Sequence, residues 1–380
     1  MKREATAPRA NWQQRCEAAG FGFHSMGGTY WDETACYAFG ADQVDLLEEV
    51  TADLHRMCLA AAEEVVAKRR YAEFAIPEAY RDFVANSLRR GDPTLYGRFD
   101  LAWDGVGEPK LLEYNADTPT ALLEASVIQW HWLEDLRATG AAGRKDIDQF
   151  NSLHEKLVAR WQALRAQWGR GGLTFSCVKD NEEDLGNIEY LRDCAIQAGF
   201  EARQLFIEDL GWNGESFVDL EEERVEALFK LYPWEWMAQE EFGQFAAGSG
   251  TRFVEPAWKM LLSNKALLVV LWEMNYGHPN LLPAYFDTRR FGFEYVKKPL
   301  LSREGSNVTL VRRKGVVRET GSYGAEGFVY QGLANMPAFG GRYPVIGSWI
   351  VGEEPAGIGI REDDSPITKN TSRFIPHYFT

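Results

Sequence analysis

Apolar side chains recur every three or four positions along residues 41–68, ADQVDLLEEVTADLHRMCLAAAEEVVAK. This period places them on one stripe of a helix, so the pattern predicts a long amphipathic helix. Further helices are expected over residues 71–90, 121–137, 149–168 and 264–274. The helix from residue 121 follows ADTPT, which supplies a threonine cap and a proline at its start.

A short apolar run at 171–180, GGLTFSCVKD, predicts a buried strand. A helix is expected after it up to Ala198, where Gly199 ends it, and ARQLFIEDL at 202–210 predicts the next strand. A strand, a helix and a second strand in this order indicate a small parallel sheet. The unit lacks the GxGxxG pattern, so a dinucleotide site is not supported. ALFKLYPWEWM, from residue 227, predicts a strand that passes into an aromatic helix.

The last third of the chain has a different pattern, in which short strands alternate with loops. Strands are expected within residues 293–313, 315–320 and 327–333, and residues 342–363 predict a hairpin. Short connections favour antiparallel pairing. The last third therefore predicts an antiparallel sheet, and the chain as a whole predicts an α+β protein.

Length sets the expected number of domains. A chain of 380 residues is too long for one simple core, so two or three packed lobes are expected. The run GAAGRKD at 140–146 is typical of a linker. We divide the chain into N-terminal helices with a hairpin at 1–140, a small α/β substrate domain at 141–235, and a C-terminal portion at 236–380.

The densest set of polar groups lies on a predicted hairpin at 96–115. YGRFDLAWD predicts one strand, GVGEP a turn and KLLEYN the second strand. Glu113 and Asn115 are two positions apart, so both side chains point to one face, and pairing through the turn brings Asp100 near them. Carboxylate and amide oxygens suit Mg²⁺, so these three side chains predict a magnesium site. A solvated strand face with a charged turn is the alternative.

A second cluster of charge lies in YVKKPLLSREGSNVTL at 295–310. Lysines end an apolar strand there, and a loop with Arg303, Gly305 and Ser306 follows. Backbone amides of a glycine loop can hold phosphate while a lysine neutralises it, although many hairpins share this pattern. Lys265 stands at a helix start, where the helix dipole disfavours a cation, so we expect an anion beside it. An exposed lysine is the alternative.

Net charge and cysteine content narrow the class of protein. The formal net charge of −15 argues against a nucleic-acid groove, which needs clustered lysine and arginine. It is compatible with a cationic substrate such as a polyamine, and equally with solubility alone. The cysteines at 16, 36, 58, 177 and 194 form no CxxC and no zinc spacing, which is typical of reduced, buried thiols in the cytoplasm.

Neither a membrane span nor an export signal is evident in the sequence. No apolar run approaches the roughly 20 residues that a membrane-spanning helix needs. The N-terminus, MKREATAPRANWQQR, is polar and has no apolar signal core. We therefore expect a cytoplasmic protein without a membrane partner.

Five segments together resemble the glutathionylspermidine synthase family. They are RFD…EYNADTPT from residue 98, LYPWEW from 231, EPAWKMLLSNKALLVVLWE from 255, VKKPLLSREGSNV from 296 and GSWIVGEEPAGIGIRED from 347. The likeness covers nearly all of the chain. It implies an ATP-grasp fold, in a permuted form, with a small inserted parallel-sheet domain. It also implies an ATP- and Mg²⁺-dependent ligase that joins a carboxylic acid to an amine through an acyl phosphate.

The resemblance also implies roles for single residues. Arg98 would stabilise the transition state of phosphoryl transfer, and Asp100, Glu113 and Asn115 would hold Mg²⁺. Contacts with ATP are implied for Arg98, Phe99, Asp100, Lys265, Lys298, Gly305, Tyr330, Gln331, Gly332 and Leu333, the last four as the backbone that reads adenine. Thr118, Thr120 and Arg361 would bind substrate, with threonines where the family has serines. We expect both phosphate-binding lysines to face solvent when the site is empty.

Bifunctional members of this family carry an N-terminal amidase with a catalytic cysteine and histidine, and no matching Cys/His pair is evident here. The expected partners are small molecules: a carboxylic acid or peptide, and an amine or polyamine. Two alternatives stay open, a nucleotide-binding protein without ligase turnover and a phosphotransferase that stops at the phosphorylated acceptor. ATP hydrolysis assayed with a panel of acids and amines separates the first alternative from the ligase. A stable phosphorylated product, in place of free phosphate and an amide, identifies the second.

Overall fold

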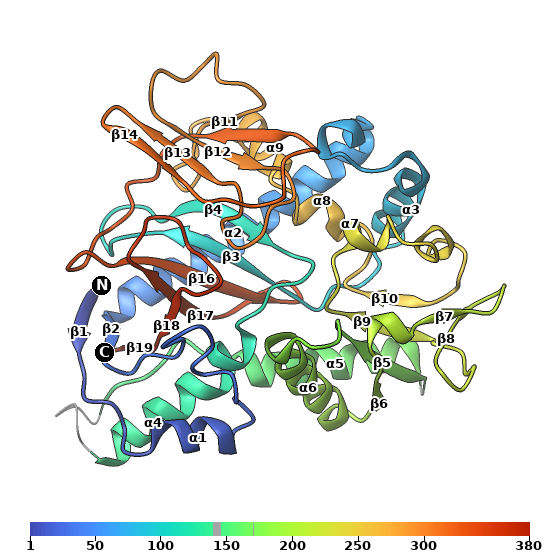
Figure 1. Ribbon diagram of the computed structural model, residues 1–380, viewed down its shortest axis with the longest axis horizontal. Coiled ribbons are helices and arrows are strands. Elements are labelled where there is room, and N and C mark those ends of the chain that lie inside the picture. Colours follow the sequence, from blue (N-terminus) through green and yellow to red (C-terminus); the bar gives the residue numbers. More distant parts are fainter. Residues whose placement is uncertain (140–145, 170) are drawn as a thin grey trace.

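A central antiparallel sheet carries both hairpins that the sequence predicts. The computed structural model describes residues 1–139, 146–169 and 171–380 (Figure 1). The five strands lie in the order β18-β17-β16-β3-β4. They are β3 (Tyr96–Ala102), β4 (Lys110–Asn115), β16 (Tyr343–Val351), β17 (Glu354–Asp363) and β18 (Arg373–Ile375). Because β16 pairs with β3, the two hairpins are neighbours in one sheet.

Alternation along the central strands gives this sheet one apolar and one polar face. Phe99 and Leu101 are completely buried. The Phe99 ring lies 6.5 Å from the ring of His55, which belongs to α2 (Ala41–Ala67), the long helix that the sequence predicts. Arg98 and Asp100 alternate with these side chains and therefore stand on the opposite face. Helix α2 covers the apolar face, which leaves the polar face for a site.

A second five-stranded antiparallel sheet has the order β11-β15-β12-β13-β14. Its strands are β11 (Ala284–Tyr285), β12 (Tyr295–Pro299), β13 (Thr309–Arg312), β14 (Gly315–Arg318) and β15 (Phe328–Gln331). It lies above the central sheet in Figure 1, with α9 (Ala266–Met274) packed against β11 and β15. The single sheet expected for the last third was therefore wrong, because the hairpin at 342–363 pairs with β3.

The predicted parallel sheet is confirmed. Its four strands, in the order β10-β9-β5-β6, all pair in parallel. They are β5 (Gly172–Ser176), β6 (Glu201–Gln204), β9 (Ala227–Lys230) and β10 (Arg252–Val254), with α5 (Leu153–Trp168) and α6 (Glu182–Gln197) beside them in Figure 1. Strand β10 was not predicted and extends the sheet to Val254. Residues 140–145 of the expected linker lie outside the described residues.

One expected helix is broken, and another contains a π-helical turn. The helix expected at 71–90 is a 3₁₀ turn, Arg70–Phe74, followed by α3 (Glu78–Arg89). The break falls where Ala75 has a φ of +50° and where Pro77 lacks an N–H to continue a helix. The helix expected at 121–137 holds a π-helical turn, Glu124–Ile128, before α4 (Gln129–Thr139). π turns occur often beside functional sites.

The two ends of the chain meet in a three-stranded sheet. Strand β2 (Ala35–Phe39) pairs antiparallel with β1 (Lys2–Ala5) and parallel with β19 (His377–Phe379). The remaining elements are α1 (Trp12–Ala18), α7 (Trp234–Met237), α8 (Lys259–Leu262), β7 (Gly211–Trp212), β8 (Phe217–Val218) and the 3₁₀ turns Ile207–Asp209 and Gly243–Phe245. Among the described residues, none of the helices has the length and apolar character needed to cross a membrane.

Candidate active site

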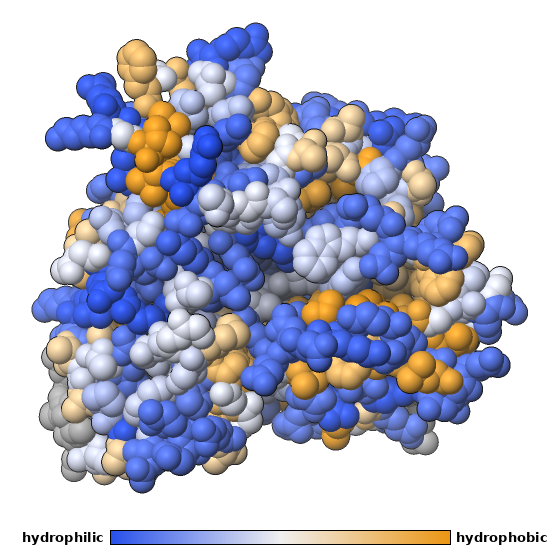
Figure 2. Space-filling view, viewed as in Figure 1, coloured by the Kyte–Doolittle hydropathy of each residue, from blue (hydrophilic) through white to orange (hydrophobic). Residues whose placement is uncertain are grey.

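Two cavities meet on the polar face of the central sheet. One has a volume of about 280 Å³ and the other about 100 Å³. Both are lined by Asp100, Glu113, Gly305, Val345 and Thr368, so the cavities adjoin at these residues. Figure 2 shows the molecule hollowed near the middle of the face it draws. We call the larger space the polar cavity and the smaller one the apolar cleft.

The hairpin of β3 and β4 brings the three predicted magnesium ligands together. Asp100 stands opposite Glu113, and Arg98 stands opposite Asn115. The Asn115 Nδ2 atom lies 3.4 Å from Asp100 Oδ2 and 3.3 Å from Glu113 Oε1. The register shifts just after Asp100, which leaves Leu112 without a partner on β3. The bulge places the candidate metal ligands beside the Leu112 backbone carbonyl, which has no partner on β3.

Cationic side chains bind each carboxylate of this cluster. Arg98 donates to both oxygens of Asp100, at 2.7 and 3.1 Å, and to the carbonyl of Thr120 at 2.7 Å. Lys265 Nζ lies 3.2 Å from Glu113 Oε2. Lys298 Nζ donates to the carbonyl of Leu112, the bulged residue, at 2.8 Å. Two carboxylates are thus surrounded by three cations.

The charges of this cluster shift the pKa values of its members. Burial alone would raise the pKa of Glu113, but Lys265 and Lys298 outweigh it and lower that pKa to about 2. Burial lowers the pKa of Lys298 to about 8, and Lys265 adds to this while Glu113 opposes it. An incoming anion would relieve the mutual repulsion of the two lysines.

The expectation that the two lysines face solvent was wrong. Lys265 is 6% exposed and Lys298 is 7% exposed. Their ammonium groups turn inward because backbone carbonyls accept their hydrogen bonds, Ser302 for Lys265 and Leu112 for Lys298. The exposed-lysine alternative for Lys265 is therefore excluded, and both lysines line the apolar cleft.

The apolar cleft is lined mainly by aliphatic side chains and by the end of β15. Its walls include Val296, Leu310, Leu333, Met336 and Ile367. Gln331 and Gly332 also line it. The Gln331 Nε2 donates to the carbonyl of Leu111 at 2.9 Å, while its buried Oε1 has no hydrogen-bond partner among the described residues. An apolar cleft whose lining includes a residue with an unsatisfied acceptor can bind an apolar ring that carries a hydrogen-bond donor.

Two residues of the implied nucleotide set line neither cavity. Phe99 is completely buried and stacks on Tyr114, with ring centroids 3.9 Å apart, on the α2 side of the central sheet. Tyr330 alternates with Gln331 along β15, and its ring contacts Tyr295 with centroids 5.7 Å apart. Side chains of neighbouring strand residues point to opposite faces, which is why these two point away.

The loop between β12 and β13 crosses the junction of the two cavities. Gly305 has a φ of +70°, and a Cβ atom there would lie 2.6 Å from the carbonyl oxygen of Thr368. Only glycine permits both this conformation and this close approach. Glu304, with a φ of +52°, precedes it and lines the polar cavity. The loop is thereby held against residues 366–370.

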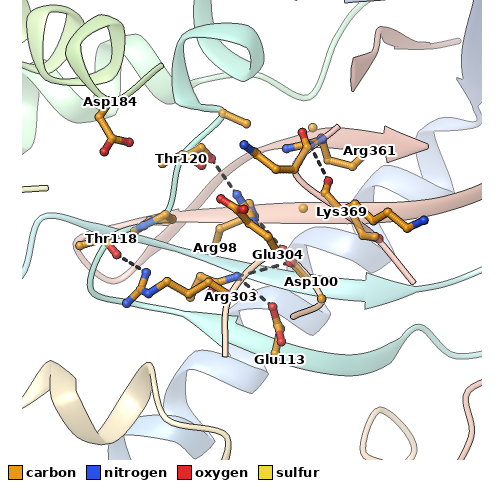
Figure 3. A pocket seen from close by; sticks show the side chains of 18 of the residues that line it. Arg98, Asp100, Glu113, Thr118, Thr120, Asp184, Arg303, Glu304, Arg361 and Lys369 are labelled. Atoms are coloured by element: carbon orange, nitrogen blue, oxygen red, sulfur yellow. Dashed lines mark hydrogen bonds and ion pairs between the residues drawn. The ribbon is translucent and has the colours of Figure 1, made fainter. Parts of the chain in front are cut away.

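Thr118, Thr120 and Arg361 all line the polar cavity, as the resemblance implies (Figure 3). The Arg361 guanidinium already donates to backbone carbonyls of Lys369, Asn370 and Ser372, at 2.8–3.0 Å. It therefore also fixes the loop that faces Gly305.

The polar cavity holds charged groups that the sequence analysis did not assign. Arg303 donates to the Thr118 hydroxyl and, at 3.0 Å, to Glu235, and its buried Nε has no partner among the described residues. Asp184 and Glu304 lie at the same cavity. Burial raises the pKa of Asp184 to about 7, and Glu183 and Glu304 add to the effect. The sequence offered a signal for Arg303, because it stands in the glycine loop at 295–310. No local sequence pattern indicates a functional role for Asp184.

The structure also brings a cysteine and a histidine together, which the sequence analysis did not expect. Cys194 Sγ on α6 lies 3.8 Å from His154 Nδ1 on α5. The thiol is completely buried, and burial raises its pKa to about 12. A protonated, inaccessible thiol is no nucleophile. All five cysteines are buried and free of disulfides, as predicted.

The donor set at the cavity junction suits magnesium in a nucleotide complex. Among the described residues there is no group of three or more His, Cys, Asp or Glu side chains placed to hold a metal. Mg²⁺ with nucleotide needs only one or two carboxylates, because phosphate oxygens and water supply the rest. Asp100 and Glu113 provide these two. A half-turn of the Asn115 amide would present its oxygen as a third ligand.

Relatives of known name resemble all or most of the chain. A Haemophilus influenzae protein named as a candidate acid–amine ligase is 44% identical over 397 aligned residues, with 100% of both chains covered. Trypanothione synthetase of Crithidia fasciculata and the bifunctional glutathionylspermidine synthetase/amidase of Escherichia coli are each 28% identical, over 89% and 87% of this chain. The chain spans only 54% and 57% of those two relatives.

A solved structure and a family model agree with this likeness. The glutathione synthetase-like effector of Globodera pallida has a TM-score of 0.56 at 11% identity and covers 97% of both chains, which shows a similar fold. The family model described as glutathionylspermidine synthase preATP-grasp matches residues 3–380. With the model and the 44% identical relative both spanning the chain, this protein belongs to the glutathionylspermidine synthase family.

Proposed function

We propose that this protein is an ATP- and Mg²⁺-dependent ligase that joins a carboxylic acid to an amine through an acyl phosphate. The observation that carries the proposal is the junction of the two cavities at Asp100, Glu113 and Gly305. A nucleotide base in the apolar cleft would direct its phosphates toward this junction. The acid would meet the terminal phosphate from the polar cavity.

The proposal includes a permuted ATP-grasp fold in which three segments of the chain have different roles. The segment 1–140 supplies the metal-binding hairpin, 141–235 the small substrate domain, and 236–380 the nucleotide-binding lysines. Gln331, Gly332 and Leu333 would read the base, and Lys265 and Lys298 would bind the phosphates. Gly305 would let the loop backbone approach the phosphates closely.

The first chemical step needs stabilisation of negative charge at the cavity junction. A carboxylate oxygen of the acid attacks the γ-phosphorus, the bond to the β–γ bridging oxygen breaks, and ADP leaves. Arg98 lines the polar cavity and contacts Asp100 at the junction, and its planar guanidinium would suit the equatorial oxygens of the transferring group. Asp100, Glu113 and Asn115 would hold Mg²⁺, which neutralises charge on the phosphate oxygens.

The second step forms the amide bond. The amine nitrogen attacks the acyl carbon, the bond to the phosphate oxygen breaks, and inorganic phosphate leaves. A cationic amine must first give up one proton to become a nucleophile, and the nitrogen gives up a second proton as the amide forms. Asp184 lines the polar cavity and, with a pKa of about 7, can accept a proton near neutral pH. Glu304 beside it would favour a cationic amine.

The two substrates would enter different parts of the polar cavity. Arg303 and Thr118 contact each other, and the part-exposed Arg303 guanidinium, which lines the polar cavity, would bind a second carboxylate of the acid or a peptide. Thr120 and Arg361 would complete that side. The acidic side, with Asp184 and Glu304, suits an amine or polyamine. This arrangement supports two small-molecule substrates of opposite charge.

The test is a matrix of acids and peptides against amines and polyamines, with ADP, phosphate and amide measured separately. The ligase predicts equal amounts of all three products, and only when both substrates and Mg²⁺ are present. ADP with a stable phosphorylated acid would instead identify a phosphotransferase. ATP binding with no ADP from any pair would favour a nucleotide-binding protein without turnover.

A further inference from the structure

A buried ion pair lies directly beneath the turn that joins the metal hairpin to the substrate-binding threonines. Asp117 is 1% exposed and Lys230, the last residue of β9, is 0% exposed. Lys230 Nζ lies 2.7 Å from Asp117 Oδ1 and donates to the carbonyl of Tyr232 at 3.0 Å. It also lies 4.3 Å from the centroid of the Trp234 ring. The pair belongs to neither cavity lining.

The second oxygen of this carboxylate reaches the polar cavity indirectly. Asp117 Oδ2 accepts a hydrogen bond from the Trp234 N–H at 2.9 Å. The next residue, Glu235, accepts from Arg303 at 3.0 Å. Arg303 in turn donates to the hydroxyl of Thr118, the neighbour of Asp117. The contacts therefore form a closed ring that joins the metal hairpin, the parallel sheet and the glycine loop.

The residue before Asp117 is fixed just as firmly. The Ala116 N–H donates to Ser263 Oγ at 3.0 Å, and its carbonyl accepts from the buried Lys259 at 3.0 Å. Lys259 also donates to the Tyr96 carbonyl at 2.7 Å. The Asp117 carboxylate holds the Trp234 backbone N–H, and the next residue, Glu235, accepts from Arg303. Asp117 therefore acts on Arg303 through Glu235, in addition to the direct contact between Arg303 and Thr118.

We propose that Asp117, balanced by Lys230, is a positioning residue that sets the spacing of Arg303 and Thr118 for the acid substrate. This inference rests on the proposed ligase function, because it concerns the side of the polar cavity assigned to the acid. The carboxylate touches no substrate and acts through the Trp234 N–H and Glu235. Removal of the Asp117 carboxylate shifts Arg303 relative to Thr118 and leaves the apolar cleft unchanged.

The test compares two double variants in which the charge pair is removed and only one acceptor is kept. Asp117→Asn/Lys230→Met retains an oxygen for the Trp234 N–H, whereas Asp117→Leu/Lys230→Met does not. Replacing a buried pair by neutral groups of similar volume is often well tolerated, so both proteins should fold. A matched control is Arg9→Met/Glu33→Leu. It removes another buried ion pair, in which Arg9 Nη2 lies 2.7 Å from Glu33 Oε1. The Glu33 carboxylate, like that of Asp117, also accepts a backbone N–H, here from Arg9 at 2.9 Å.

The expected result is a change in the KM for the acid without a comparable change in the KM for ATP. The Leu double variant raises the KM for the acid about tenfold or more, the range for losing an outer partner of a site, and leaves the KM for ATP within about twofold. The Asn double variant and the control keep the acid KM near the wild-type value. An acid KM that stays unchanged in the Leu variant, or rises in step with the ATP KM, overturns the proposal.

A second readout does not depend on turnover. Amide hydrogen exchange in residues 234–237, which begin with the N–H that Asp117 accepts, should quicken in the Leu double variant and stay at the wild-type rate in the Asn double variant and the control. Equal exchange in all four proteins overturns the positioning role. If the wild-type protein shows no ligase activity with any pair, the proposed function fails, and the exchange data still decide whether Asp117 positions Arg303.

Discussion

Replacing Arg98 by lysine keeps the charge at the cavity junction and removes the planar fork. Three N–H groups of Arg98 are engaged, two on Asp100 and one on the Thr120 carbonyl. A lysine ammonium can reach Asp100 or Thr120, but not both with this geometry. Losing one hydrogen bond from a charged donor costs about 1.5–3 kcal/mol of folding free energy. The protein should therefore melt at a lower temperature and still fold.

The effect of Arg98→Lys on turnover should exceed what lost stability explains. A preorganised donor that stabilises the transition state is worth about a hundredfold in kcat, or about 2.7 kcal/mol. The assay measures kcat, the ATP dissociation constant by calorimetry, and the melting temperature. Arg160→Lys is the control, because Arg160 donates to the Thr94 carbonyl at 2.8 Å without lining either cavity. Near-native kcat, or equal losses of kcat and ATP affinity, would refute the catalytic role.

Three further outcomes test the charge cluster and the core. Glu113→Gln should weaken Mg²⁺ dependence of turnover by at least about tenfold; unchanged dependence rejects Glu113 as a ligand. Lys265→Ala and Lys298→Ala should each weaken ATP binding measured by calorimetry, and native affinity in both places the phosphates elsewhere. Burial lowers the pKa of His377 to about 3, below the 6.5 of an unfolded histidine. Only the unfolded state then takes up a proton between these pH values, so stability is lost as pH falls below 6.5. Between pH 7 and 5, the free energy of unfolding of His377→Gln should fall by about 2 kcal/mol less than that of the wild type, as measured by urea denaturation.

The metal hairpin could be predicted from sequence because its information is local. Turn residues and alternating polarity place Glu113 and Asn115 on one face, and the short turn brings Asp100 opposite Glu113. The bulge at Leu112 was not predicted, because no proline or glycine marks it. It matters because its free carbonyl holds Lys298.

Contacts between distant segments could not be predicted from local patterns. Lys265 and Lys298 converge through pairing of β12 with β15 and docking of α9. Local pattern suggested an anion beside each lysine, but only the resemblance assigned both to one nucleotide. Their burial was missed because a lysine at a strand end or a helix start usually reaches solvent. Asp184 was missed because it stands in an acidic helix start that is typical of any solvated helix. Strand β10, with three residues, is too short to give a period.

If the charge cluster binds Mg²⁺ and nucleotide as proposed, its ion pairs make the binding of the two ligands interdependent. A divalent cation that arrives alone must compete with Lys265 for Glu113 and with Arg98 for Asp100, which leaves positive charge unbalanced. A polyphosphate that arrives alone draws those cations away and leaves two carboxylates facing negative charge. Each ligand removes the penalty that the other creates, and the coupling must be equal in both directions. The cluster would therefore bind the metal–nucleotide complex more tightly than the metal alone or the nucleotide alone.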